Sequence, residues 1–79
     1  MTYEKLMELA TKYKTNDMIN AALRGKKLTA IKRGSKWFIL DNGDTDGLYG
    51  AAFDTKRAAM RRIEDVYKVA ADIREKEGI

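Results

Sequence analysis

The chain has 79 residues, a net charge of +4, and neither cysteine nor histidine. This length allows a single domain over residues 1–79 with a small core. The two missing residue types exclude disulfides, thiolate metal sites and the commonest general base. No apolar run approaches the roughly 18 residues of a membrane span. No signal peptide is visible at the start either, so we expect a cytoplasmic protein without a membrane partner.

The first segment has helical periodicity. Thr2 is a plausible N-cap for a first helix, and Thr15-Asn16-Asp17 provides a break with a fresh cap. A second short helix then reaches Gly25, which can close it in a left-handed conformation. We therefore expect either two helices or one bent helix over residues 3–24. The apolar stripe of the first helix comprises Tyr3, Leu6, Met7, Ala10 and Tyr13.

Two helices with a short break also allow a helix-turn-helix motif, in which the second helix reads bases. The exposed positions for that role would be Asn16, Asn20 and Arg24. Because helix pairs that simply pack together are far commoner, packing is the preferred interpretation.

Residues 27–41 have the pattern of a β-hairpin. Gly34-Ser35 suits a two-residue type II′ turn, which places Arg33 opposite Lys36 and Lys32 opposite Trp37. The same register gives the hairpin two apolar faces, although a half-exposed hairpin should have one polar face. Either helices cover both faces or one face binds a partner. One face has Thr29, Ile31, Phe38 and Leu40, and the other has Leu28, Ala30, Lys32, Trp37 and Ile39.

A turn-rich acidic loop over residues 41–47 and a third strand over residues 48–53 should follow the hairpin. Asp54 or Thr55 then caps a helix that runs to about Glu77, with Gly78 as terminator. The predicted fold is therefore α+β, with an N-terminal helix or helix pair, a three-stranded antiparallel sheet and a long C-terminal helix. The apolar stripe of that last helix comprises Ala59, Ile63, Val66, Tyr67, Ala70 and Ile73.

Catalytic and metal-binding groups are scarce. The only serine, Ser35, lies in a predicted tight turn with no histidine to activate it. The loop from Asn42 begins like a calcium-binding loop, but its twelfth position is Phe53 where calcium needs a bidentate glutamate. We expect neither an enzyme nor a metal or cofactor site.

Basic residues are concentrated in two blocks. Residues 18–40 carry six basic groups and no acid, and residues 56–62 carry four more at the start of the last helix. Clustered cations with a neighbouring aromatic are typical of phosphate and nucleic-acid binding. The alternative for these charges is an ordinary solvated surface, with helical pairs such as Arg61–Asp65 and Glu64–Lys68. The candidate binding residues are Arg24, Lys26, Lys27, Lys32, Arg33, Lys36, Trp37, Lys56, Arg57 and Arg61.

Residues 32–64 resemble the arm-type DNA-binding domain of phage tyrosine integrases. The likeness rests on the aromatic strand over residues 36–40, a Gly/Asp loop, and Phe53-Asp54-Thr55-Lys56-Arg57 opening a helix. It implies a three-stranded sheet backed by one helix, with Lys32, Lys36 and Trp37 near the DNA major groove. The acidic residues between the second and third strands depart from the family's pattern.

The size and style of the chain also resemble small phage accessory proteins, including anti-CRISPR proteins. We therefore expect a non-catalytic binding protein that engages DNA, RNA or a host nucleoprotein through the basic hairpin and the basic helix start. The alternative is an anti-CRISPR-type inhibitor that binds a host defence protein directly. Because the last helix buries partly alanine, pairing as a homodimer is one way for this small domain to gain stability.

Overall fold

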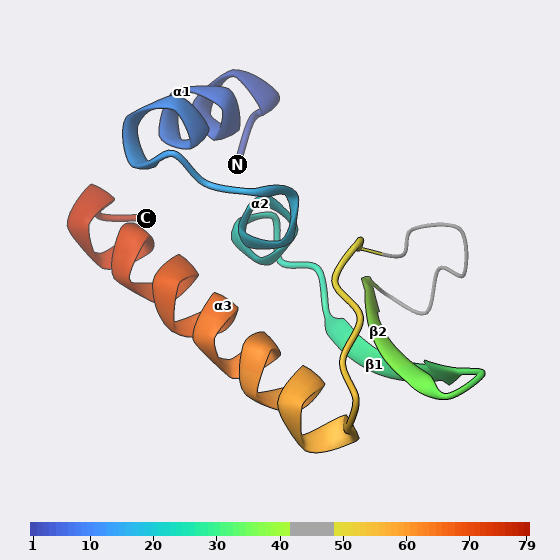
Figure 1. The fold of residues 1–79 in the computed structure, drawn as a ribbon. Coiled ribbons are helices and arrows are strands. Elements are labelled where there is room, and N and C mark those ends of the chain that lie inside the picture. Colours follow the sequence, from blue (N-terminus) through green and yellow to red (C-terminus); the bar gives the residue numbers. More distant parts are fainter. Residues whose placement is uncertain (42–48) are drawn as a thin grey trace.

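In the part of the chain that the structure describes, three helices and one β-hairpin form an elongated arrangement of 40 × 22 × 18 Å. The computed structural model describes residues 1–41 and 49–79, and the predicted acidic loop lies almost wholly outside them. The elements are α1 (Tyr3–Tyr13), α2 (Asp17–Leu23), β1 (Leu28–Arg33), β2 (Lys36–Asp41) and α3 (Lys56–Glu77). α3 runs along the length of the molecule, with α1 and α2 near its C-terminal end and the hairpin near its N-terminal end (Figure 1). No helix in the described ranges is long and apolar enough to cross a membrane.

The N-terminal segment forms two separate helices and not the single bent helix that the sequence also allowed. The Thr2 side chain caps α1 by accepting from the Lys5 N–H at 3.1 Å. Lys14 ends this helix in a left-handed conformation, with φ of 52°. Asn16 then caps α2 as predicted, and Gly25 follows α2 with φ of +80°.

The apolar stripe predicted for α1 is wrong at two positions. Tyr3 is 75% exposed and Met7 is 45% exposed, whereas Leu9 is completely buried. α1 buries Leu6 and Leu9, with Tyr13 packed at the margin of the core. Periodicity predicted the helix correctly, but the side of the helix that packs depends on how α1 lies against its neighbours.

We predict that the Asn16→Ala variant is less stable by about 0.5–2 kcal/mol, the usual value for a lost N-cap. The Asn16 side chain accepts from the Ile19 N–H at 2.9 Å, and it holds the start of a helix of only seven residues. Urea unfolding followed by circular dichroism measures the loss. The control is Asn16→Ser, which can still cap; an equal loss in both variants would contradict the capping role.

The hairpin has the register that the Gly34-Ser35 turn predicted. Arg33 lies opposite Lys36, Lys32 opposite Trp37, and the pairing continues to Leu28 opposite Asp41. Gly34 has φ of +62° and Ser35 has no positive φ, as a type II′ turn requires. The register determines which side chains face α3, so Leu28 and Ile39 enter the core while Ala30 and Trp37 pack against it.

Among the described residues, the predicted third strand is not formed and the sheet has two strands. Within the described residues 49–53, Phe53 makes one antiparallel bridge with Trp37, and the Tyr49 N–H donates to the Ile39 carbonyl at 2.9 Å. Regular pairing from the Trp37–Phe53 bridge would put residue 51 opposite Ile39. Because the Tyr49 N–H bonds to Ile39 instead of residue 51, the segment has two extra residues. They form a bulge around Gly50, and the regular strand pairing stops there.

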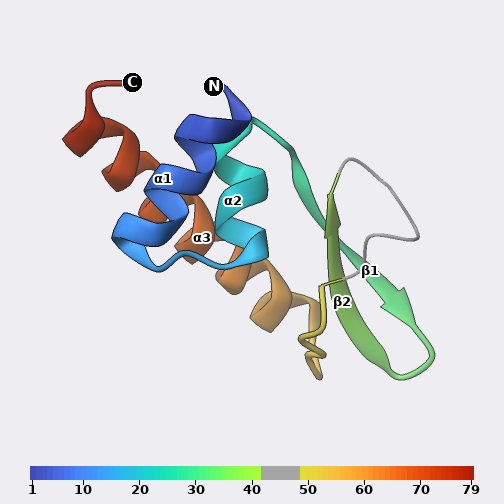
Figure 2. The ribbon, with the colours of Figure 1, turned by 90° about the horizontal axis from the view of Figure 1, so that it is seen from above.

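α3 braces the whole fold, as predicted. Its N-cap is Thr55, whose side chain accepts from the Ala58 N–H, and Gly78 ends it with φ of +70°. Tyr67 belongs to the predicted stripe but is 39% exposed, and its hydroxyl accepts from the Leu28 N–H at 2.7 Å. The three helices lie together on one side of the hairpin (Figure 2). The buried side chains of α3 are Ala59, Ile63, Val66, Ala70 and Ile73.

A polar cluster joins α1 to the end of α3. The Glu77 carboxylate accepts from the Tyr13 hydroxyl at 2.8 Å and from the Lys12 ammonium at 2.9 Å, and Lys5 lies 3.6 Å away. The hydrogen bonds from Lys12 and Tyr13 lower the pKa of Glu77 from 4.5 to about 2. A single carboxylate therefore ties three side chains of α1 to the C-terminal turn of α3.

We predict that the stability contributed by Glu77 depends on pH. Its pKa is lower in the folded chain, so the contribution is complete above pH 4.5 and is lost as the pH falls toward 2. Urea unfolding of the wild type and of Glu77→Gln should differ at pH 7 and converge in acid. The exposed acid Glu75 offers the control for removing a carboxylate from this end of α3: Glu75→Gln should be as stable as the wild type at pH 7.

Candidate functional site

The start of α3 has four exposed basic side chains and no acid in its first turn. We call Lys56, Arg57, Arg61 and Arg62 the α3 basic cluster. Thr55 begins the helix at this point, so all four residues fall within its first two turns. Positive charge there opposes the helix dipole, which disfavours each cation by about 0.3–1 kcal/mol.

The helical ion pairs that would neutralise this cluster do not form. Arg61 lies four residues before Asp65, and Glu64 lies four before Lys68, but neither pair comes within ion-pair distance among the described residues. Arg57 and Arg62 also have no acidic partner in that part of the chain. The cluster therefore makes no ion pair with the described residues.

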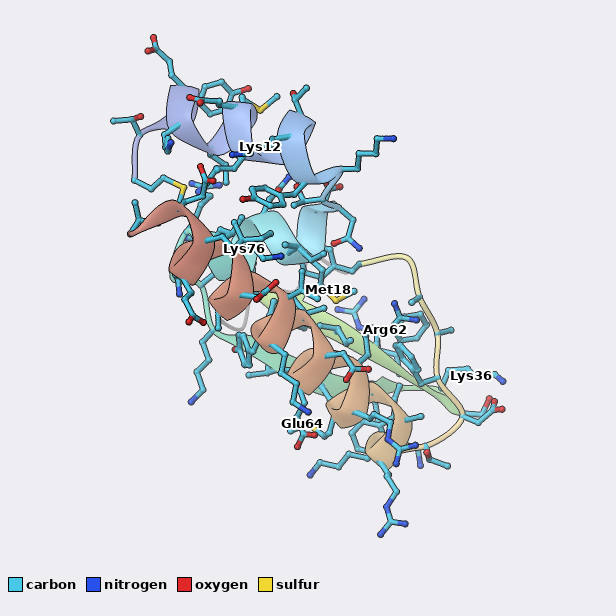
Figure 3. The ribbon with its side chains drawn as sticks, turned by 90° about the vertical axis from the view of Figure 1, so that its left-hand side faces the viewer. Lys12, Met18, Lys36, Arg62, Glu64 and Lys76 are labelled. Carbon is cyan, nitrogen blue, oxygen red and sulfur yellow. The ribbon has the colours of Figure 1, made fainter. Side chains whose placement is uncertain are left out.

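Two shallow depressions bring the cluster together. One is lined by Phe53, Thr55 and Ala58 with Asp65 and the three arginines, and the other by Met60 and Glu64 with three members of the cluster. Arg62 and Glu64 lie on opposite sides of the α3 ribbon (Figure 3). Arg62 was missing from the candidate residues, although it belongs to the same basic block of the sequence, 56–62.

Trp37 is half-buried beside the cluster. Its ring packs against the core, and its backbone exchanges two hydrogen bonds of 2.8 Å with Phe53. The Lys56 ammonium lies 5.8 Å from the ring centroid, within cation–π range. Trp37 therefore anchors the hairpin to the start of α3 and positions Lys56.

Lys36 lies at the tip of the hairpin, beside the segment that leads into α3 (Figure 3). Its ammonium forms an ion pair with Asp54, and this hydrogen bond and charge lower the pKa of the Asp54 carboxyl. Lys36 thus contacts the residue just before the Thr55 N-cap of α3, and its charge is locally compensated.

The remaining candidates lie elsewhere. Arg24 and Lys26 line a groove with Lys5 and Arg74. Arg74 is twelve residues beyond Arg62, about 18 Å along the helix axis at about 1.5 Å per residue. Lys27 precedes β1, and Lys32 and Arg33 end it, all three exposed. The ten predicted residues therefore do not share one surface.

α2 has little surface to offer as a recognition helix. Met18, Ala21, Ala22 and Leu23 are buried among its seven residues. Asn20 accepts from the Thr15 hydroxyl, in addition to the capping role of Asn16. Two of the three proposed base-reading positions thus hold the α1–α2 connection together.

In the described part of the chain, no three acidic side chains are grouped so as to hold a metal ion. The calcium-like stretch from Asn42 lies mostly outside the described residues. Comparison with models of protein families, with curated proteins and with solved structures found no match to this chain. The resemblance to integrase arm-type domains therefore stays a prediction.

Proposed function

We propose that this protein binds nucleic acid without catalysis, and that its α3 basic cluster contacts the phosphates. The observation that carries this proposal is the gathering of Arg57, Arg61 and Arg62 around one depression with no ion-pair partner among the described residues. Arginine suits phosphate because its planar guanidinium can donate two parallel hydrogen bonds. Three such groups within two helical turns match a closely spaced row of anions.

The position of the cluster also supports an anionic ligand. Four cations at a helix start repel one another and the helix dipole, so the free protein holds them at an electrostatic disadvantage. A bound chain of phosphates would offset both the repulsion among the cations and their repulsion by the helix dipole.

Fluorescence anisotropy with labelled oligonucleotides of about 16 nucleotides or base pairs tests the proposal. If four phosphates are contacted on a duplex, the logarithm of the affinity should fall with the logarithm of salt at a slope of about −3.6. Absence of binding to DNA and RNA at low salt would reject nucleic acid as the ligand.

A second candidate is direct binding to a protein, including a host defence protein. It is favoured by the hairpin face turned away from the helices, where Ile31 and Phe38 remain only partly buried and outside the main core. Co-purification from a host lysate at high salt would separate this candidate from the first, because apolar contacts persist where phosphate contacts weaken.

A further inference from the structure

We infer that the nucleic acid bound by the α3 basic cluster is a duplex, held by its phosphates with no base stacked on the protein. This inference rests on the proposed function and goes beyond it by naming the form of the ligand. Two features of the cluster carry it: the aromatic rings beside the cations are not open, and the cations surround the helix start on three sides.

The first feature is the state of the neighbouring rings. Proteins that bind single strands combine cations with aromatic faces on which bases stack. Trp37 is half-buried and has the Lys56 ammonium over its ring, while Phe53 is half-buried and packs against the core. The more exposed aromatic side chains of the described residues, Tyr3 and Tyr67, lie on α1 and in the middle of α3.

The second feature is the spread of the cations. A helix turns by about 100° per residue, so Arg57 and Arg61 face outward while Lys56 and Arg62 project toward opposite flanks. The contacts agree, because Lys56 meets Trp37 of β2 whereas Arg62 lines a depression with Asn16 and Ile19 of the α1–α2 side.

The width of this arrangement fits two strands better than one. An α-helix with its side chains is about 10–12 Å across, close to the roughly 12 Å width of the DNA major groove between its two phosphate backbones. Cations on both flanks of such a helix can reach both backbones. A single strand offers only one line of phosphates, so it would leave Lys56 or Arg62 without a contact.

The test compares a duplex with its component single strand at equal length in about 0.1 M salt. Four phosphate contacts on the duplex give a slope of about −3.6 and three on the single strand give about −2.1, so the duplex should bind roughly 30-fold more tightly at 0.1 M salt. Two further variants, Trp37→Leu and Phe53→Leu, remove each ring but keep apolar bulk. Circular dichroism confirms that they fold, and neither variant should weaken single-strand binding more than duplex binding.

Equal or tighter binding of the single strand would overturn the duplex inference and leave the proposed function standing. A selective loss of single-strand affinity in Trp37→Leu or Phe53→Leu would also overturn it, because it would identify a stacking ring. Failure of both oligonucleotides to bind would reject the proposed function itself. A preference for the duplex, with no selective loss of single-strand affinity in either ring variant, supports the inference.

Discussion

Replacing Arg57, Arg61 and Arg62 together by glutamine is expected to weaken nucleic-acid binding by on the order of 10²–10³-fold in about 0.1 M salt. Each phosphate contact on a duplex contributes about −0.9 to the slope of log affinity against log salt, so the slope should change from about −3.6 to about −0.9. The fold should survive, because all three side chains are exposed and have no ion pair in the described part of the chain. Anisotropy titrations across a salt series measure both quantities.

The matched control removes three positive charges from elsewhere on the surface. Lys14, Lys68 and Lys76 are exposed and lie outside the α3 basic cluster. Their joint replacement by glutamine gives the same net charge as the arginine variant. If both variants lost affinity and slope equally, overall charge would explain the binding, and the cluster would have no special role.

Replacing Ile39 by alanine is expected to destabilise the domain by about 2–5 kcal/mol, as large-to-small changes in a core do. Ile39 is completely buried in β2 and belongs to the same core cluster as Ala59 and Ile63 of α3. A domain of this length has a total stability of roughly 4–12 kcal/mol. The variant should therefore be partly unfolded at moderate urea concentrations where the wild type is folded.

Ile31 provides the control for this substitution. It has the same side chain on the neighbouring strand but is only half-buried, and it lies on the other face of the hairpin. Ile31→Ala should lose clearly less stability in the same urea unfolding measurement. Equal losses would mean that the interface between the hairpin and α3 is not the main core.

Much of the secondary structure could be predicted because its signals are local. Caps at Thr2, Asn16 and Thr55 bond to N–H groups three residues away, and Gly34 turns the chain within two residues. Such interactions depend on neighbours in sequence, so the helix bounds and the hairpin register followed directly. The third strand failed because its pairing with β2 needs a register between distant segments, and that register breaks at Gly50.

The candidate site likewise combines features that are visible in the sequence with features that only the fold creates. The sequence identified both basic blocks and Trp37, because charge and residue type are visible without a fold. It did not reveal that Arg24 and Lys26 line a groove with Arg74, away from the cluster, or that Lys36 is paired with Asp54. Pairing and exposure depend on which segments meet across the fold.

The lack of histidine and cysteine, the basic start of the last helix and the order of most elements are visible in the amino-acid chain alone. The folded chain adds the pairing of Lys36 with Asp54, 18 residues away, and the position of Arg62 at the depression beside Phe53. It also placed the Trp37 ring against the core, with Lys56 over it. The reason is that composition and local periodicity are properties of the chain, whereas burial and charge compensation arise only when distant residues are brought into contact.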